Sequence, residues 1–182
     1  MSKKILSFIM VLCLIFSAAI GANAYTQTFY VDNDALPDSG GSNHRLQYYF
    51  ANYITGSNHF NSDARIHTDW MYFNTAFYMW NYNNSIAGPS NVDSTTVQVY
   101  LNDSRFNDDS ALYEFSWTNN IGGRTTLEAV YNQDSAPAGW SNVFYDKSTY
   151  MASAPSLCVT TRCNDYGIGT GADGVRFIVE YA

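Results

Sequence analysis

The clearest pattern of hydrophobic and polar positions lies at the C-terminal end of the chain, in residues 175–181. Apolar residues alternate there with mostly polar ones, and the apolar set is Val175, Phe177, Val179 and Tyr181. Because successive side chains of a strand point to opposite faces of a sheet, this alternation predicts a half-buried β-strand. The glycine-rich residues 169–174 before it predict a turn.

Short runs of the same kind recur through the rest of the chain, separated by clusters of Gly, Asn, Asp, Ser and Pro. The predicted strands cover residues 29–31, 46–54, 63–73, 76–82, 96–102, 111–117, 125–132, 140–145 and 149–159. No long stretch has the apolar spacing of an amphipathic helix. Many short strands with turn residues between them are typical of an all-β sandwich or barrel, here as a single domain.

The first 24 residues have the features of a secretory signal peptide. Lys3 and Lys4 precede an almost continuously apolar run over residues 5–20, and Ala22-Asn23-Ala24 is a small-residue cleavage site. A retained membrane anchor is the alternative, but the apolar run is short and the cleavage site follows it closely. We therefore expect residues 1–24 to be cleaved, residues 25–182 to form the domain, and the protein to be secreted or held at the cell surface without membrane insertion.

The charge of the chain limits its partners. Removal of the two signal-peptide lysines leaves 7 basic residues against 16 acidic ones, a net charge of −9. Nucleic acids and anionic membranes select basic surfaces, so we expect neither as a partner. The polar groups are mainly Asn, Ser, Thr and Asp beside many aromatic residues, which suits an exported β-protein that binds neutral, hydroxyl-rich ligands.

Two cysteines, Cys158 and Cys163, remain after signal cleavage. An even pair in an exported chain predicts a disulfide, here closing a small loop. A metal site is the first alternative, but the pair has no neighbouring His or Cys ligands. A redox pair is the second, but such pairs usually have two intervening residues rather than four.

The order of segments resembles the golvesin-like, xanthan-lyase-type carbohydrate-binding domain family over most of the mature chain. Val31-Asp32-Asn33 stands where that family opens, and residues 76–80 match its Trp-bearing strand. Gln133 followed by Gly139-Trp140 matches a later segment. Residues 172–177 (Ala-Asp-Gly-Val-Arg-Phe) are very close to the family's closing motif.

This resemblance implies an antiparallel β-sandwich of the jelly-roll type that binds carbohydrate. It also marks five residues as parts of structural motifs: Gln133, Gly139, Trp140, Asp173 and Arg176. We interpret Asp173 as a cap on the backbone N–H groups of its own turn and Arg176 as the partner of a nearby carboxylate. A catalytic or binding pair is the alternative interpretation.

Sugars bind to aromatic side chains through their C–H faces and to amide, carboxylate or guanidinium groups through their hydroxyls. Trp80 and Trp140 lie in strand motifs, so we expect them in the core. Trp70 and Trp117 lie beside polar, turn-like residues and are the preferred platform candidates. Tyr48, Tyr49 and Tyr53 are further candidates.

Acidic clusters in two predicted loops suggest a structural calcium ion, because calcium takes six to eight oxygen ligands. The candidate ligands are Asp32, Asp34, Asp38, Asp103, Asp108 and Asp109. Neither cluster has the spacing of an EF-hand loop, and no other cofactor is expected.

Catalytic signatures such as His-Glu-x-x-His, Gly-x-Ser-x-Gly and the phosphate-binding loop are missing. The main hypothesis is therefore a secreted, non-catalytic module that binds extracellular or cell-wall polysaccharide. A structural or adhesive protein that associates with other copies is one alternative. A small polysaccharide-active enzyme with two facing carboxylates is the other.

Overall fold

The computed structural model describes residues 24–33, 43–50, 52–72, 74–82, 92–118, 122–146, 153–162 and 165–181. Its elements are twelve strands and two short 3₁₀ helices. The strands are β1 Tyr25–Val31, β2 Asn43–Tyr48, β3 Asn52–Thr55, β4 Asp63–His67, β5 Phe77–Tyr82, β6 Val92–Leu101, β7 Ala111–Thr118, β8 Arg124–Tyr131, β9 Gly139–Asp146, β10 Ser153–Thr160, β11 Thr170–Ala172 and β12 Val175–Tyr181. The 3₁₀ helices are η1 Phe60–Ser62 and η2 Trp70–Tyr72. Among the described residues, no helix is long and apolar enough to cross a membrane.

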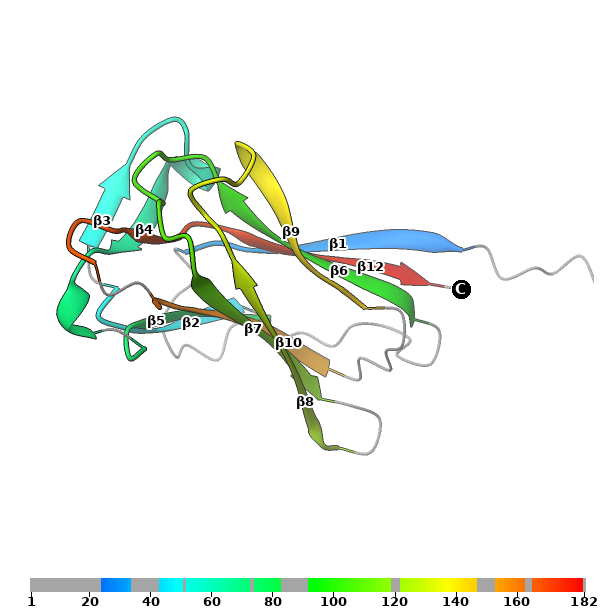
Figure 1. The fold of residues 1–182 in the computed structure, drawn as a ribbon. Helices are drawn as coiled ribbons and strands as arrows, with labels where there is room; N and C mark the ends of the chain where they lie inside the picture. Colours follow the sequence, from blue (N-terminus) through cyan, green and yellow to red (C-terminus); the bar gives the residue numbers. More distant parts are fainter. Residues whose placement is uncertain are drawn as a thin grey trace, which may run out of the picture.

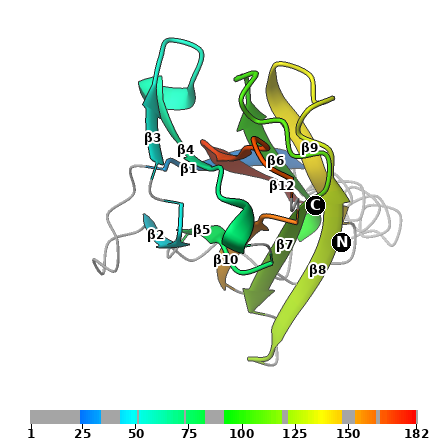
Figure 2. The same cartoon turned by 60° about the vertical axis from the view of Figure 1, so that its left-hand side comes forward.

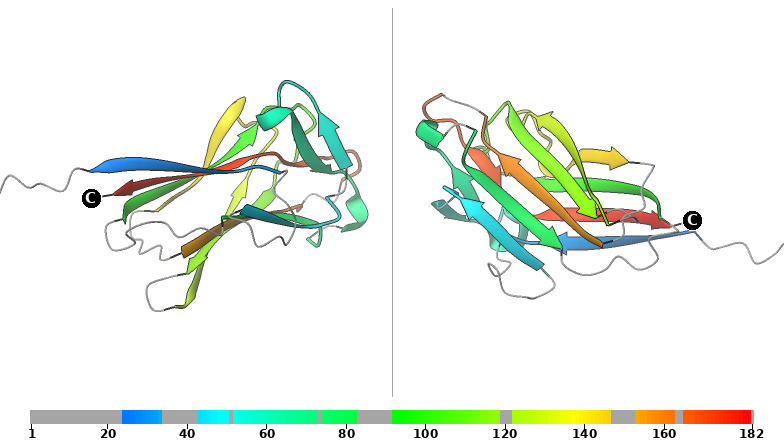
Figure 3. Two further views of the ribbon diagram at one scale, coloured as in Figure 1. Left: turned by 180° about the vertical axis from the view of Figure 1, so that it is seen from behind. Right: turned by 90° about the horizontal axis from the view of Figure 1, so that it is seen from below.

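Two antiparallel sheets lie face to face, as the pattern of strands predicted (Figure 1). One sheet has the strand order β1-β12-β6-β9 and the other has the order β2-β5-β10-β7-β8. Figure 3 shows the two layers from behind and from below. The chain thus forms an antiparallel β-sandwich, as expected.

The closing strand β12 lies inside the four-stranded sheet, paired with β1 on one side and β6 on the other. Its four apolar side chains are at most 2% exposed, whereas Arg176, Ile178 and Glu180 face outward. The facing layer supplies Tyr78, Trp80, Tyr113 and Phe115 to the same core. Burial of large aromatic side chains from both sheets is the main force that holds the layers together.

A small third sheet, of order β11-β4-β3, stands at the end of the sandwich away from the C-terminus (Figure 2). The predicted turn 169–174 is partly wrong, because Thr170–Ala172 forms β11 and pairs with β4. A Cβ added to Gly171 would lie 2.2 Å from the ring of Phe106, so only glycine fits against that ring. Packing of Phe106, which local periodicity does not reveal, therefore makes this glycine part of a strand.

The predicted strand 46–54 is also wrong in extent. It divides into β2 and β3, which belong to different sheets. Tyr49 between them has φ = 59°, a left-handed conformation that ends a strand. The strand predicted over 63–73 is also too long. It ends at His67, and the 3₁₀ helix η2 begins at Trp70.

Candidate functional site

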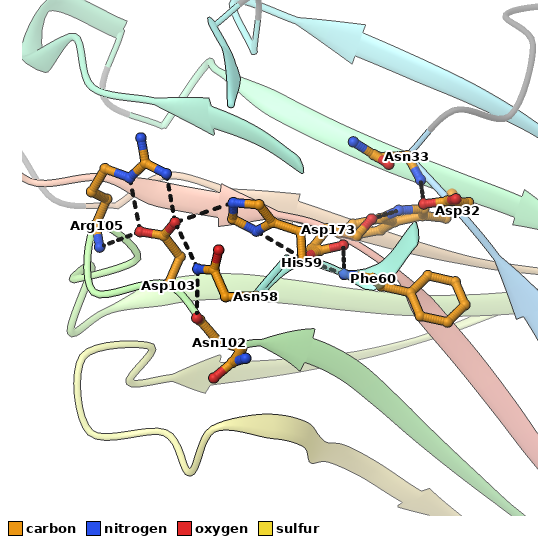
Figure 4. A network of polar contacts seen from close by, with 10 residues as sticks. Asp32, Asn33, Asn58, His59, Phe60, Asn102, Asp103, Arg105 and Asp173 are labelled. Atoms are coloured by element: carbon orange, nitrogen blue, oxygen red, sulfur yellow. Dashed lines mark hydrogen bonds and ion pairs between the residues drawn. The ribbon is translucent and has the colours of Figure 1, made fainter. Parts of the chain in front are cut away.

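A buried chain of polar side chains joins the β3–β4 end of the molecule to the closing strand (Figure 4). The Asp173 carboxylate accepts the backbone N–H of Phe60 at 3.1 Å, and Asp173 Oδ2 lies 3.3 Å from His59 Nδ1. On the other side of the imidazole, His59 Nε2 lies 3.2 Å from Asp103 Oδ2. Asp103 in turn accepts two side-chain hydrogen bonds from Arg105, at 2.8 and 2.6 Å.

The protonation states of these polar side chains follow from burial and from the hydrogen bonds of Arg105. Burial raises the pKa of Asp173 to about 8, so its carboxyl is mainly protonated at neutral pH. Burial also lowers the pKa of His59, which favours the neutral imidazole. Hydrogen bonds from Arg105 lower the pKa of Asp103 and keep it ionised. A protonated Asp173 then donates to His59 Nδ1, while His59 Nε2–H faces the Asp103 carboxylate.

These groups are inaccessible. The side chains of His59 and Asp173 are 0% exposed and that of Asp103 is 5% exposed. A carboxyl with a raised pKa near a second carboxylate is what the enzyme hypothesis requires, but a substrate has no access to Asp173. Asp173 and Asp103, joined through His59, therefore hold the loop before β4 against the segment before β12. The predicted cap of Asp173 on its own turn is wrong, because its backbone partner, Phe60, lies far away in the sequence.

An aromatic patch lies on the outer face of the four-stranded sheet. It consists of Tyr30 from β1, Tyr100 from β6, Trp140 from β9 and Phe60 from η1. The ring of Trp140 is 5.8 Å from Tyr30, 5.1 Å from Phe60 and 5.2 Å from Tyr100. Tyr30 also stacks on Phe60 at 5.9 Å and is 45% exposed. The patch thus offers aromatic surface to solvent that is held in place by ring–ring contacts.

A polar row crosses the same face beside the patch. Tyr30 pairs with Arg176, Arg176 with Gln98, and Gln98 with Asn142, so the row spans all four strands. Arg176 Nε donates to Gln98 Oε1, and Gln98 Nε2 donates to Asn142 Oδ1. The guanidinium carbon of Arg176 stands 4.5 Å from the centre of a Trp140 ring, in a cation–π contact. The predicted carboxylate partner of Arg176 is wrong within the described residues, because its partners there are Gln98 and Trp140.

Two predicted platform residues, Tyr48 and Tyr49, form with Tyr72 a second exposed aromatic region near β2 and η2, the tyrosine cluster, and the third, Tyr53, lies apart on β3. Tyr48 and Tyr49 are 49% and 40% exposed, and their ring centres are 4.0 Å apart. Tyr49 stacks on Tyr72 at 3.5 Å. Tyr53 is 52% exposed and is covered on one face by Arg65 at 4.5 Å. This tyrosine cluster remains an alternative platform.

The tryptophans are distributed between core and surface differently from the prediction. The prediction that Trp117 is a surface platform is wrong, because Trp117 is 3% exposed and packs on Phe115 at 4.7 Å. Trp80 is in the core at 1% exposure, as expected, and donates to the Asp173 carbonyl. Trp140 was expected in the core, but it is half-buried on the outer face. The side chain of Trp70 lies outside the described residues.

The other motif residues serve the fold. Gln133 is buried, donates to the Tyr113 hydroxyl and the Gly171 carbonyl, and accepts the Gly171 N–H. Gly139, at the start of β9, has φ = 99°, a conformation that favours glycine. Cys158 is a buried free thiol on β10, so the structure does not form the disulfide predicted with Cys163, which lies outside the described residues.

The calcium candidates are mostly engaged by protein groups. Asp108 is 0% exposed and accepts hydrogen bonds from Ser110 and Thr170. Asp103 is bound by Arg105, Asp32 accepts from the Asn61 side chain, and Asp109 is exposed. Asp34 and Asp38 lie outside the described residues. In the described part of the chain, no three His, Cys, Asp or Glu side chains are arranged to hold a metal ion.

A surface hollow of about 280 Å³ lies beside Asp103. Its polar lining comes from Asn102, Asp103, Ser104, Gln133 and Asp134. The one aromatic residue in its wall, Phe106, is 2% exposed, so the hollow offers no ring for stacking. It is a weaker sugar site than the aromatic patch.

Comparison with known proteins supports the fold. No protein-family model and no curated protein matches the chain. A structure of Paenibacillus xanthan lyase superposes with a TM-score of 0.54 at 14% identity, over 83% of this chain and 13% of the lyase. The chain thus corresponds to a small part of that enzyme.

Two carbohydrate-binding modules superpose less closely. TmCBM61, solved in complex with β-1,4-galactotriose, gives a TM-score of 0.37 at 9% identity and covers 91% of each chain. CBM28, a module specific for non-crystalline cellulose, gives 0.37 at 13% identity over 65% of this chain and 72% of the module. The similarity to the lyase, at its low identity, shows a shared fold, and the golvesin-like assignment remains a resemblance.

Several residues of the site were absent from the sequence-based candidates, namely Tyr30, Phe60, Gln98, Tyr100 and Asn142. The alternation in β6 contained a signal for two of them, since Val97, Val99 and Leu101 point inward and leave Gln98 and Tyr100 outward. We conclude that the chain is an antiparallel β-sandwich with the fold of a xanthan lyase domain, bearing an aromatic patch and a polar row on one outer face.

Proposed function

We propose that the protein is a secreted, non-catalytic module that binds polysaccharide on the outer face of its four-stranded sheet. The observation that carries this proposal is the aromatic patch with the polar row directly beside it. Exposed rings pack against the C–H faces of sugars, and amide and guanidinium groups bond the hydroxyls. The patch and the row supply both kinds of group on one surface.

Rigidity supports the same assignment. Trp140 contacts three other rings and one guanidinium, so its orientation is set before a ligand arrives. The polar row is likewise held by hydrogen bonds between Arg176, Gln98 and Asn142. A binding surface that is already ordered loses less conformational entropy when it binds. Tyr30, which is 45% exposed, is the natural first contact for a sugar ring.

The test is retention of the mature chain, residues 25–182, on a panel of immobilised polysaccharides. We expect Tyr30→Ala and Trp140→Ala each to weaken retention at least about fivefold, because a stacked ring contributes on the order of 1 kcal/mol or more. Tyr166→Ala is the matched control, since Tyr166 is 90% exposed and lies outside the patch. Retention on no polysaccharide would overturn the proposal.

Tyr48→Ala and Tyr49→Ala test the alternative platform. If these variants lose retention while Tyr30→Ala and Trp140→Ala keep it, the sugar binds at the tyrosine cluster. The protein remains a carbohydrate-binding module in that case, but the assigned face is wrong.

Association between copies is the second candidate function, and strand β8 favours it. In the described residues β8 pairs only with β7, so its other edge is open. It is eight residues long, every residue is at least partly exposed, and Val130 is 57% exposed. Open, regular edge strands promote strand pairing between chains. A molar mass that rises with concentration in analytical ultracentrifugation, and that Val130→Lys abolishes, would support this role.

A further inference from the structure

The polar row has a direction that the arginine imposes. A guanidinium group donates hydrogen bonds and accepts none, so Gln98 has to present its oxygen to Arg176. The Gln98 amide nitrogen therefore faces Asn142, which has to present its own oxygen. Each amide orientation follows from the previous one, and the row is ordered from Arg176 to Asn142.

This order leaves donors at the two ends of the row. The Gln98 and Asn142 oxygens accept bonds inside the row. Within the described residues, the guanidinium makes its hydrogen bond through Nε, and its two Nη groups have no protein acceptor. Among these residues the Asn142 Nδ2 group likewise has no acceptor, and Asn142 is exposed. The row therefore offers N–H groups to a ligand that accepts hydrogen bonds.

Within the described part of the chain, the charge of Arg176 is also uncompensated by direct contact. No described carboxylate lies within ion-pair distance of Arg176, whereas Arg105 binds Asp103 at 2.6 Å. This contrast occurs in a chain with 16 acidic and 9 basic residues, where carboxylates are plentiful. The cation is held over Trp140 instead, at 4.5 Å. A planar guanidinium with free Nη groups is well suited to binding a carboxylate.

From these observations we propose that the ligand of this face is an acidic polysaccharide containing uronate residues. The uronate ring contacts the aromatic patch and its carboxylate accepts hydrogen bonds from Arg176, while another oxygen of the same polymer, on a hydroxyl or a second carboxylate, accepts from Asn142. This inference rests on the proposed function and specifies the class of sugar. A carboxylate satisfies the Arg176 donors and neutralises the guanidinium charge, which a neutral hydroxyl does not.

The test compares acidic polymers with forms that differ only in the carboxyl group. Polygalacturonate, alginate and glucuronoxylan are each presented beside a carboxyl-reduced form, in which the carboxylate has become a primary alcohol. We expect at least one native polymer to bind the mature protein about tenfold or more tightly than its reduced form, the effect of a charge-assisted hydrogen bond. This preference should weaken as salt rises, since the contact is partly exposed.

Two variants assign the preference to the row. Arg176→Gln should bind native and reduced polymers equally, at the level of the reduced one. Asn142→Asp keeps an oxygen for Gln98 but adds a negative charge, so it should also lose the preference, and its exposed position makes it tolerant of substitution. Arg162→Gln removes the same charge from an exposed arginine outside the row and should behave as the unaltered protein does.

The outcomes separate the two proposals. If native and reduced polymers bind equally and Trp140→Ala weakens both, the face is correct and the acidic ligand is wrong. If a preference exists but survives both Arg176→Gln and Asn142→Asp, the row does not cause it and the inference fails. If a sulfated polymer is bound as tightly as the carboxylated one, the assignment to uronate fails. If no polymer binds, the proposed function fails together with the inference.

Discussion

Replacement of Asp173 by Asn is expected to remove a pH dependence of stability near neutrality. The buried carboxyl has a pKa of about 8 in the folded protein, against an ordinary value of 3.8. The folded protein therefore keeps a proton that the unfolded chain releases. The stability that this proton contributes is complete below pH 3.8, decreases as pH rises, and is lost above about pH 8. Asn reproduces the protonated form, since it accepts from Phe60 N–H and donates to His59 Nδ1.

The magnitude follows from the two pKa values. One proton with these values contributes about 2 kcal/mol less stability at pH 8 than at pH 6.5. His59 acts in the opposite direction, because burial lowers its pKa and makes stability rise with pH up to about 6.5. Because His59 is present in both the native protein and Asp173→Asn, the difference between their stabilities above pH 6.5 reports on Asp173. A lowered pKa places the effect of Asp103 below pH 3.8, outside this window.

The assay is urea unfolding of the native protein and Asp173→Asn at pH 6.5, 7, 7.5 and 8 and constant ionic strength. We expect the variant to gain about 2 kcal/mol on the native protein across the series. Asp109→Asn, at an exposed aspartate, is the control and should run parallel to the native protein. Parallel curves for Asp173→Asn as well would show that Asp173 is already ionised in the fold, and the reasoning on its burial would be refuted.

Three further changes test the packing. Trp117→Ala leaves a cavity in the core, so it should lower the free energy of urea unfolding by about 3–5 kcal/mol, while the folded fraction keeps its polysaccharide affinity. A loss below about 1 kcal/mol would contradict the burial of Trp117. Gln133→Ala leaves the N–H and carbonyl of Gly171 unpaired, so it should lower the free energy of urea unfolding by about 1–3 kcal/mol for each group. An unchanged stability would show that water replaces the side chain. Burial raises the pKa of Cys158 to about 12, so in a Cys163→Ser background iodoacetamide should label the thiol only after unfolding; rapid labelling of the native protein at pH 8 would mean that it is exposed.

Trp117 shows where local sequence is sufficient to predict burial, and Trp140 shows where it is not. Trp117 continues the alternating set that includes Tyr113 and Phe115, so its phase already predicts a core position. Its polar neighbours suggested the surface, and periodicity proved the better guide. Trp140 stands at the start of a strand with an irregular register later along it, where phase is ambiguous. Only the packed sheets decided that it faces outward.

The polar network of Asp173 shows what local sequence does not predict. The motif around Asp173 favoured a local turn cap, yet its backbone partner is 113 residues away. The pKa of about 8 comes from burial beneath the β3–β4 end. Burial of a carboxyl depends on what is packed over it, and no short window of sequence contains that information.

The sequence by itself determined the approximate positions and inward face of most strands and the all-β class, because alternation is a property of neighbouring residues. Only the tertiary structure decided which strands are neighbours. It brought Tyr30, Gln98, Asn142 and Arg176 from four separate strands into one row, and it placed Trp140 beside them. Strand order and register arise from contacts between distant segments, and so the candidate site appears only when the sheet is assembled.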